Sequence, residues 1–319
     1  MIRVTAALVG ASLLLVACGS VGGAPPRERL LVVTTVAPIT DIVAQVAGDD
    51  VEVRGLVPEG VDSHTFEPSP DDARLLAEAD AMIVNGLFLE EPSLELARPN
   101  LPEGAPIVAL AERTIDRDEW IFDVSFPREE GRPNPHLWTD PRLARAYAGH
   151  VRDVLSELDP DHAEGYARRF ELFADILDRL DAAIARAWST VPTDHRKLVT
   201  YHDSWPYFAR RYGIEVVAAV QPSDFSEPSA REVRDVIEQV RAAGVPAIFG
   251  SEVFPSPVLR RIAEESGARY VDDLADDDLP GAPGDPDHSY VGMMVANVRA
   301  MVSALGGDPA ALGELDPTR

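Results

Sequence analysis

The sequence predicts an α/β protein of two lobes, each a mostly parallel sheet flanked by helices, joined by one long rigid helix. Strand-like apolar runs alternate with helical patterns along the chain, and a single long amphipathic stretch interrupts this alternation near the middle. The 319 residues are also enough for two domains that each bury a core of their own.

The first half of the chain alternates strand and helix signals. A continuous apolar and β-branched run predicts a buried strand at residues 30–36, and Pro38 opens a helical pattern that stops at Gly48. Further strands are predicted at residues 51–57, 81–85 and 107–110. Helices over 69–80 and 140–158 each begin with a capping Ser or Asp followed by proline.

Residues 159–188 carry apolar side chains at spacings of three and four, which predicts one helix long enough to bridge two lobes. The alternation then restarts, with strands at 198–201, 216–220, 247–249 and 270–272 and helices from about 205, 229, 257 and 290. The predicted division is a signal peptide 1–17, a tether 18–29, an N-terminal lobe 30–158, a linking helix 159–190 and a C-terminal lobe 191–319.

The N-terminus has the order of an export signal: Arg3, an apolar run too short to span a bilayer, and small residues before Cys18. Cys18 is the only cysteine, so the chain has no intrachain disulfide and no CxxC site. The sequence LVAC (15–18) resembles a bacterial lipobox, which implies acylation of Cys18 and an extracytoplasmic, membrane-anchored lipoprotein.

The net charge argues against a nucleic-acid partner. Asp and Glu number 54 against 29 Lys and Arg, a formal charge of −25 at pH 7, whereas phosphate backbones are bound by basic surfaces. Cations are the ligands that such a chain attracts.

Three histidines share one local context. His64, His136 and His202 each lie in the few residues between an extended segment and a helix start, and paired carboxylates, Asp272 and Asp273, end a predicted strand. Loops at the carboxyl ends of parallel strands converge on one crevice. Three imidazoles and a carboxylate suit a divalent transition metal. The remaining histidines lie on helical patterns or in polar loops and are not expected to be ligands: His150, His162, His195 and His288.

The histidine contexts resemble the motifs of the metal-binding solute-receptor lipoproteins of zinc and manganese ABC importers. The motifs are, in order, DSHTFEPSP (62–70), NGLFLE (85–90), PHLWTDP (135–141), YHDSWPYF (201–208), EPSA (227–230) and SYVGMM (289–294). The resemblance extends over about residues 30–305.

The resemblance implies one divalent ion between two lobes, with His64, His136 and His202 as imidazole ligands and Asp272 as the carboxylate. Asp273 stands where the family has a small residue, which leaves the choice between the two carboxylates open. The resemblance further implies a monomer that delivers its ion to a membrane permease. Residues 116–134 are acidic but lack the histidines that zinc receptors of the family often carry before the second ligand.

Three neutral imidazoles favour Zn²⁺ over Mn²⁺, whose sites usually contain more carboxylate oxygens. A membrane-anchored zinc hydrolase is one alternative, but it would need an open coordination position and a general base, and no HExxH motif is present. A surface adhesin is the other alternative, which the sequence does not test.

Overall fold

The computed structural model describes residues 29–221, 226–251 and 257–315, without the side chains of Asp272 and Asp273. Cys18, the signal segment and all but the last residue of the tether lie outside the described residues. Among the residues described, no helix is both long and apolar enough to cross a membrane.

Two parallel four-stranded sheets confirm the predicted α/β fold. The first has the order β2-β1-β3-β4 and the second the order β6-β5-β7-β8. The strands of the first sheet are β1 (Leu30–Thr34), β2 (Val51–Gly55), β3 (Ala81–Val84) and β4 (Ile107–Ala109). Those of the second are β5 (Lys197–Thr200), β6 (Glu215–Ala219), β7 (Ala247–Ser251) and β8 (Arg269–Leu274).

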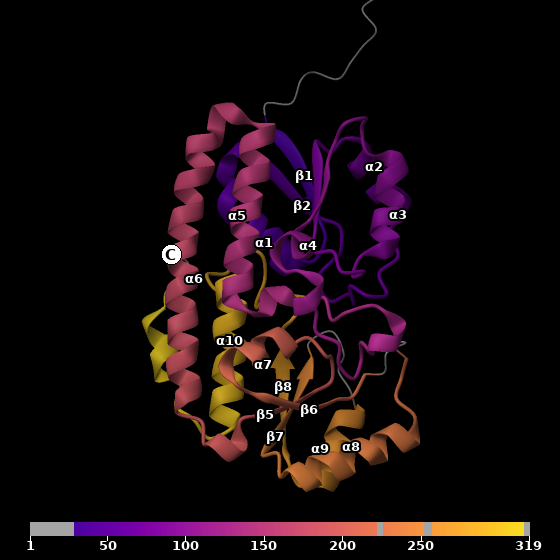
Figure 1. The fold of residues 1–319 in the computed structure, drawn as a ribbon, viewed down its shortest axis with the longest axis vertical. Helices are drawn as coiled ribbons and strands as arrows, with labels where there is room; N and C mark the ends of the chain where they lie inside the picture. The colour runs from indigo at the N-terminus through magenta and orange to yellow at the C-terminus, as the bar shows by residue number, and fades with distance from the viewer. Residues whose placement is uncertain (1–28, 222–225, 252–256, 316–319) are drawn as a thin grey trace, which may run out of the picture.

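Helices flank both sheets, and Figure 1 shows the two lobes one above the other. The first lobe has α1 (Ala37–Ala47), α2 (Pro70–Ala77), α3 (Glu91–Asn100), α4 (Leu110–Thr114) and α5 (Pro141–Leu158). The second lobe has α7 (Pro206–Tyr212), α8 (Ala230–Ala243), α9 (Pro257–Ser266) and α10 (Tyr290–Ala304).

The helix starts that the sequence predicts are present with their caps. The Ser69 side chain accepts a hydrogen bond from the Asp72 N–H ahead of α2, and Asp140 accepts one from the Arg142 N–H ahead of α5. The short helices α3 and α4 were not predicted. Pro92 and Pro99 both lie within α3, where proline in the sequence indicates a helix break rather than a helix.

The predicted linking helix is α6 (Ala163–Ser189), which runs along one side of both lobes (Figure 1). It begins later than predicted because Pro160–His162 forms a 3₁₀ turn first. Its buried face contributes large side chains such as Phe173, Leu180 and Trp188 to one continuous apolar cluster, which also takes residues from α1, α5, α7 and α10. The long helix therefore provides core for both lobes at once.

A buried ionic cluster ties α6 to both lobes. Asp181 of α6 is 8% exposed and accepts hydrogen bonds from Arg211 (2.9 and 2.6 Å) and Tyr212 (2.9 Å) of α7, and from Arg142 (3.2 Å) of α5. Burial acts to raise the pKa of Asp181, but these hydrogen bonds outweigh it and hold the pKa below its ordinary value. The carboxylate is thus charged at neutral pH, and both of its oxygens accept hydrogen bonds.

We expect Asp181→Ala to lower the free energy of unfolding by about 2–4 kcal/mol, because it removes the hydrogen-bonded partner of Arg211 and leaves it only the Asp140 carboxylate at 3.8 Å. Since the folded-state pKa is depressed, the wild-type contribution is present at neutral pH and lost as the pH falls through the acid range. Denaturant unfolding measures both effects.

Asp178→Ala is the matched control on the same helix. Asp178 pairs with Arg145 of α5 at 3.3 Å, but the two side chains are 59% and 40% exposed, so its loss should cost no more than about 1 kcal/mol. Equal costs for the two variants would contradict a bracing role for Asp181.

Candidate metal centre

Three imidazole nitrogens meet where the two lobes face each other. The Nε2 atom of His64 lies 3.2 Å from Nε2 of His136 and 3.2 Å from Nε2 of His202. His64 lies in the loop after β2, His136 immediately precedes the 3₁₀ turn Leu137–Thr139, and His202 follows β5. The structure therefore brings together the three histidines that the sequence selects, from segments as far apart as 138 residues.

The spacing of these nitrogens suits a bound ion. Nitrogen ligands at about 2.0–2.1 Å from a tetrahedral zinc are roughly 3.3 Å apart, close to the separations observed. Nitrogens that are not ligands of an ion can approach this closely only if a proton lies between them, since two lone pairs facing each other repel.

Two of the imidazoles are held in orientation by acceptors at Nδ1, the ring nitrogen that is not part of the Nε2 cluster. Asn134 Oδ1 lies 2.8 Å from His136 Nδ1 and also accepts the His136 backbone N–H at 3.0 Å. Asp276 Oδ2 lies 2.9 Å from His202 Nδ1. An acceptor at Nδ1 keeps the proton there and directs the Nε2 lone pair inward, as outer partners of metal-ligating histidines do.

The charge states of the three histidines differ. Burial, followed by repulsion from His202, holds the pKa of His136 and His64 well below the ordinary value of 6.5, so both are neutral. Burial acts to lower the pKa of His202 as well, but the Asp276 carboxylate outweighs it and raises that pKa to about 10. At neutral pH, His202 is therefore protonated at both ring nitrogens, whereas His64 and His136 each carry a single ring proton.

Sequence analysis missed the acidic strap, residues 276–278, which follows β8. Asp276 accepts a hydrogen bond from Ser204 in the second lobe, whereas Asp277 Oδ2 accepts from Ser63 Oγ at 2.6 Å in the first lobe. Carboxylate oxygens of Asp276 and Asp277 and a His202 ring nitrogen lie within 4.8 Å of one another. Burial and the neighbouring Asp276 raise the pKa of Asp277 to about 7. A run of three Asp directly after a predicted strand was the available signal.

The predicted carboxylate ligand, Asp272, lies within β8, but its side chain is outside the described residues, as is that of Asp273. The strap begins only two residues beyond the end of β8 and already contacts His202. The carboxyl end of β8 therefore lies at the histidine site.

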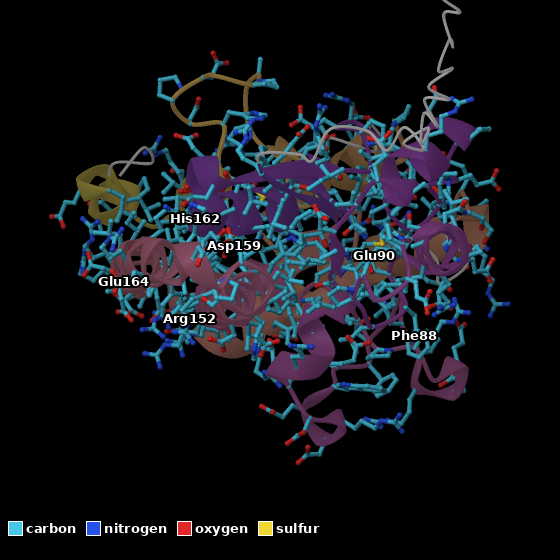
Figure 2. The ribbon with its side chains drawn as sticks, turned by 90° about the horizontal axis from the view of Figure 1, so that it is seen from above. Phe88, Glu90, Arg152, Asp159, His162 and Glu164 are labelled. Atoms are coloured by element: carbon cyan, nitrogen blue, oxygen red, sulfur yellow. The ribbon has the colours of Figure 1, made fainter. Side chains whose placement is uncertain are left out.

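The loop Asn85–Glu90 supports the site from the first lobe. Buried Glu90 accepts hydrogen bonds from Thr35 Oγ1 (2.8 Å) and from the backbone N–H groups of Asn85 (2.7 Å) and Gly86 (3.0 Å). Asn85 in turn donates to the carbonyl of Pro135, the residue before His136, at 2.9 Å. In Figure 2, Glu90 lies inside the lobe and Phe88 lies toward its margin.

The remaining histidines lie apart from this cluster. His162 Nδ1 lies 2.7 Å from Asp159, His195 Nδ1 lies 3.0 Å from the Leu305 carbonyl, and His288 Nε2 lies 3.2 Å from Glu59. His150 lies on α5. The structure does not bring any of the four to the three Nε2 atoms.

Comparison with known proteins points to metal transport. The profile of the family described as "Zinc-uptake complex component A periplasmic" matches residues 32–304. The zinc-binding protein TroA of Treponema pallidum is 31% identical, with 86% of this chain and 88% of TroA aligned. Its solved structure gives a TM-score of 0.79 and covers 87% of this chain and 99% of its own.

Two further relatives are named for other metals. The manganese-binding lipoprotein MntA of Halalkalibacterium halodurans is 28% identical, with 92% of this chain and 95% of MntA aligned. The iron-binding protein YfeA of Yersinia pestis is also 28% identical, over 88% of this chain and 87% of YfeA.

The raised pKa of His202 predicts that ion uptake releases a proton. A metal ion at Nε2 must displace the proton held there, so affinity should rise about tenfold per pH unit through the neutral range. Titration calorimetry in buffers of different ionisation enthalpy should find about one proton released per ion at pH 7.

Asp276→Asn should remove most of this proton release, because the carboxylate that raises the His202 pKa is gone. Asp159→Asn, which changes the carboxylate beside His162, is the matched control. Release that persists unchanged in Asp276→Asn would show that the proton comes from another group.

Proposed function

Because the chain belongs to the family of periplasmic zinc-uptake component A proteins, we propose that it captures one divalent transition metal ion between its lobes and delivers it to the permease of an ABC importer. The observation that carries this proposal is the meeting of three Nε2 atoms, with those of His136 and His202 each 3.2 Å from that of His64. Zinc is the preferred cargo and manganese the next.

Family membership makes the chain a substrate-binding protein of a metal ABC transporter rather than an enzyme. The side chains around the histidines suit this role. Asn134 and Asp276 are occupied in orienting His136 and His202, and Ser63 and Ser204 hold the acidic strap. A zinc hydrolase would instead need a carboxylate free to activate water at an open coordination position.

We assign His64, His136 and His202 as the imidazole ligands and Asp272 as the carboxylate. The position of Asp272 near the carboxyl end of β8, at the edge where His202 follows β5, supports this assignment. Asp276 then has a different role, because an oxygen that accepts from His202 Nδ1 orients that ligand from behind.

The zinc preference rests on the donor set. Three neutral imidazoles and one carboxylate match the tetrahedral sites that zinc favours, whereas manganese favours octahedral sites rich in oxygen. The relatives named for zinc, manganese and iron are 28–31% identical to this chain, so the choice among metals depends on details around the ion.

We propose that the protein is a monomer. Acylation of Cys18 would anchor it to the outer side of the cytoplasmic membrane, where a permease could receive its cargo. The lipobox-like sequence LVAC supports this proposal. Cys18→Ser in a bacterial host should abolish lipid labelling and release the chain. Retention at high salt with unchanged labelling would contradict the anchor.

Native mass spectrometry tests the function directly. We expect one retained divalent ion per chain, and a loss of affinity of at least about 100-fold when His64, His136 or His202 is changed to Ala. The matched controls are His150→Ala, His162→Ala, His195→Ala and His288→Ala. A chain that retains no ion, or a control variant that costs as much as a ligand variant, would overturn the proposal.

The carboxylate assignment predicts a ranking. Asp272→Ala should weaken metal binding by about 100-fold or more, and Asp273→Ala only mildly, because successive side chains of a strand point to opposite faces. Calorimetric titration of both variants and of Asp277→Ala measures this. The reverse ranking would move the ligand to Asp273, and a severe loss in Asp277→Ala alone would move it to the acidic strap.

A further inference from the structure

A tight turn, residues 123–126, holds an aromatic ring against the histidine cluster. The Asp123 N–H donates to the Phe126 carbonyl at 3.0 Å, and the Phe126 N–H donates to Asp123 Oδ1 at 3.2 Å. We call this segment the Phe126 turn. The two reciprocal bonds fix the direction in which the Phe126 ring projects.

The Phe126 turn is anchored to both ligand-bearing motifs. Asn134, which orients His136, donates to Asp123 Oδ2 at 3.0 Å. On the other side, Asp203, the neighbour of His202, accepts the Ser125 N–H at 3.2 Å. The position of Phe126 is therefore set by the same residues that set the imidazoles.

The Phe126 ring covers part of the histidine cluster. Its centroid lies 5.6 Å from that of His64 and 5.9 Å from that of His136, and the side chain is only 7% exposed. Phe126 and His64 line a pocket of about 130 Å³, whereas His136 and His202 are not among its lining residues. The Phe126 ring thus lies beside His64 on the wall of this pocket and also packs against His136, which does not line it.

We propose that Phe126 determines metal selectivity by excluding water from the ion. This inference rests on the proposed function and adds to it the reason why one ion is chosen. A pocket of this size has room for several water molecules, and the ring denies them positions beside the ion.

Exclusion of water affects zinc and manganese differently. Three imidazoles and one carboxylate complete the tetrahedral shell of zinc without any water. Manganese prefers six ligands, mostly oxygen, so the same four side chains leave it one or two short, according to whether the carboxylate binds through both oxygens or one, unless water enters. An apolar side chain that excludes water therefore weakens manganese binding more than zinc binding.

The test compares Phe126→Ala with wild type in competition titrations of Zn²⁺ against Mn²⁺. Loss of the Phe126 ring should lower the zinc-over-manganese affinity ratio about tenfold, mainly through tighter manganese binding. Water-proton relaxation by bound Mn²⁺ should show more metal-bound water in Phe126→Ala than in wild type. A merely structural role for Phe126 would not change that water count.

Two further variants complete the design. Phe126→Leu restores apolar bulk and should restore both the ratio and the water count. Phe122→Ala is the matched control in the same segment, where the ring packs under the Arg128 guanidinium at 4.3 Å from its centroid, and it should change neither quantity.

The outcomes separate this inference from the function on which it rests. Wild-type protein that binds neither ion would overturn the proposed function and this inference with it. Wild-type protein that binds an ion, with an unchanged ratio and water count in Phe126→Ala, would overturn the selectivity role alone. Equal changes in Phe126→Ala and Phe126→Leu would also overturn it, because apolar bulk would then not be the cause.

Discussion

The rest of the structure depends on the mutual approach of three imidazole Nε2 atoms. The fold must hold the three rings together, because nitrogens at 3.2 Å repel wherever neither a cation nor a proton lies between them. Asn134 and Asp276 do this by binding the Nδ1 side of His136 and His202. Because these acceptors belong to different lobes, the two lobes must also be held in fixed relative positions.

The relative positions of the lobes are set by α6 and by contacts that cross between the lobes. The helix contributes to an apolar cluster shared by both lobes, and Asp181 joins α5 to α7 through it. Near the site, the acidic strap binds Ser63 of the first lobe while it also binds His202 and Ser204 of the second. The proposed ion site thus lies between lobes that are held together by core packing and by charge-assisted hydrogen bonds.

Much of this fold could be predicted from local sequence signals, because each signal acts over a few residues. Alternating apolar runs predicted the two sheets, and the spacing of Phe173, Leu180 and Trp188 predicted the linking helix. The loop positions of the three histidines agree with where strands end in a parallel sheet. The short helix α3 was missed because two prolines hide it from pattern reading.

The supporting carboxylates could not be predicted, for a physical reason. Ser63 and Asp277 are 214 residues apart, and nothing local to either indicates that they meet. The pairing of β7 with β8 also changes register between Phe249 and Ser251, so counting along an ideal strand misplaces the residues beyond that shift. The family resemblance indicates Asp272 as the carboxylate ligand, and only the folded chain shows that Asp276 contacts Nδ1 of His202.

These contacts between the lobes also limit how an ion can enter or leave the proposed site. A helix that supplies core to both lobes opposes wide separation of the lobes, since separation would expose buried apolar surface. The strap and the Phe126 turn are held by hydrogen bonds instead, and each such bond is worth only about 1–3 kcal/mol net. For the proposed ion site, passage of the ion is therefore cheapest by local movement of these loops, which contact His202 and His64.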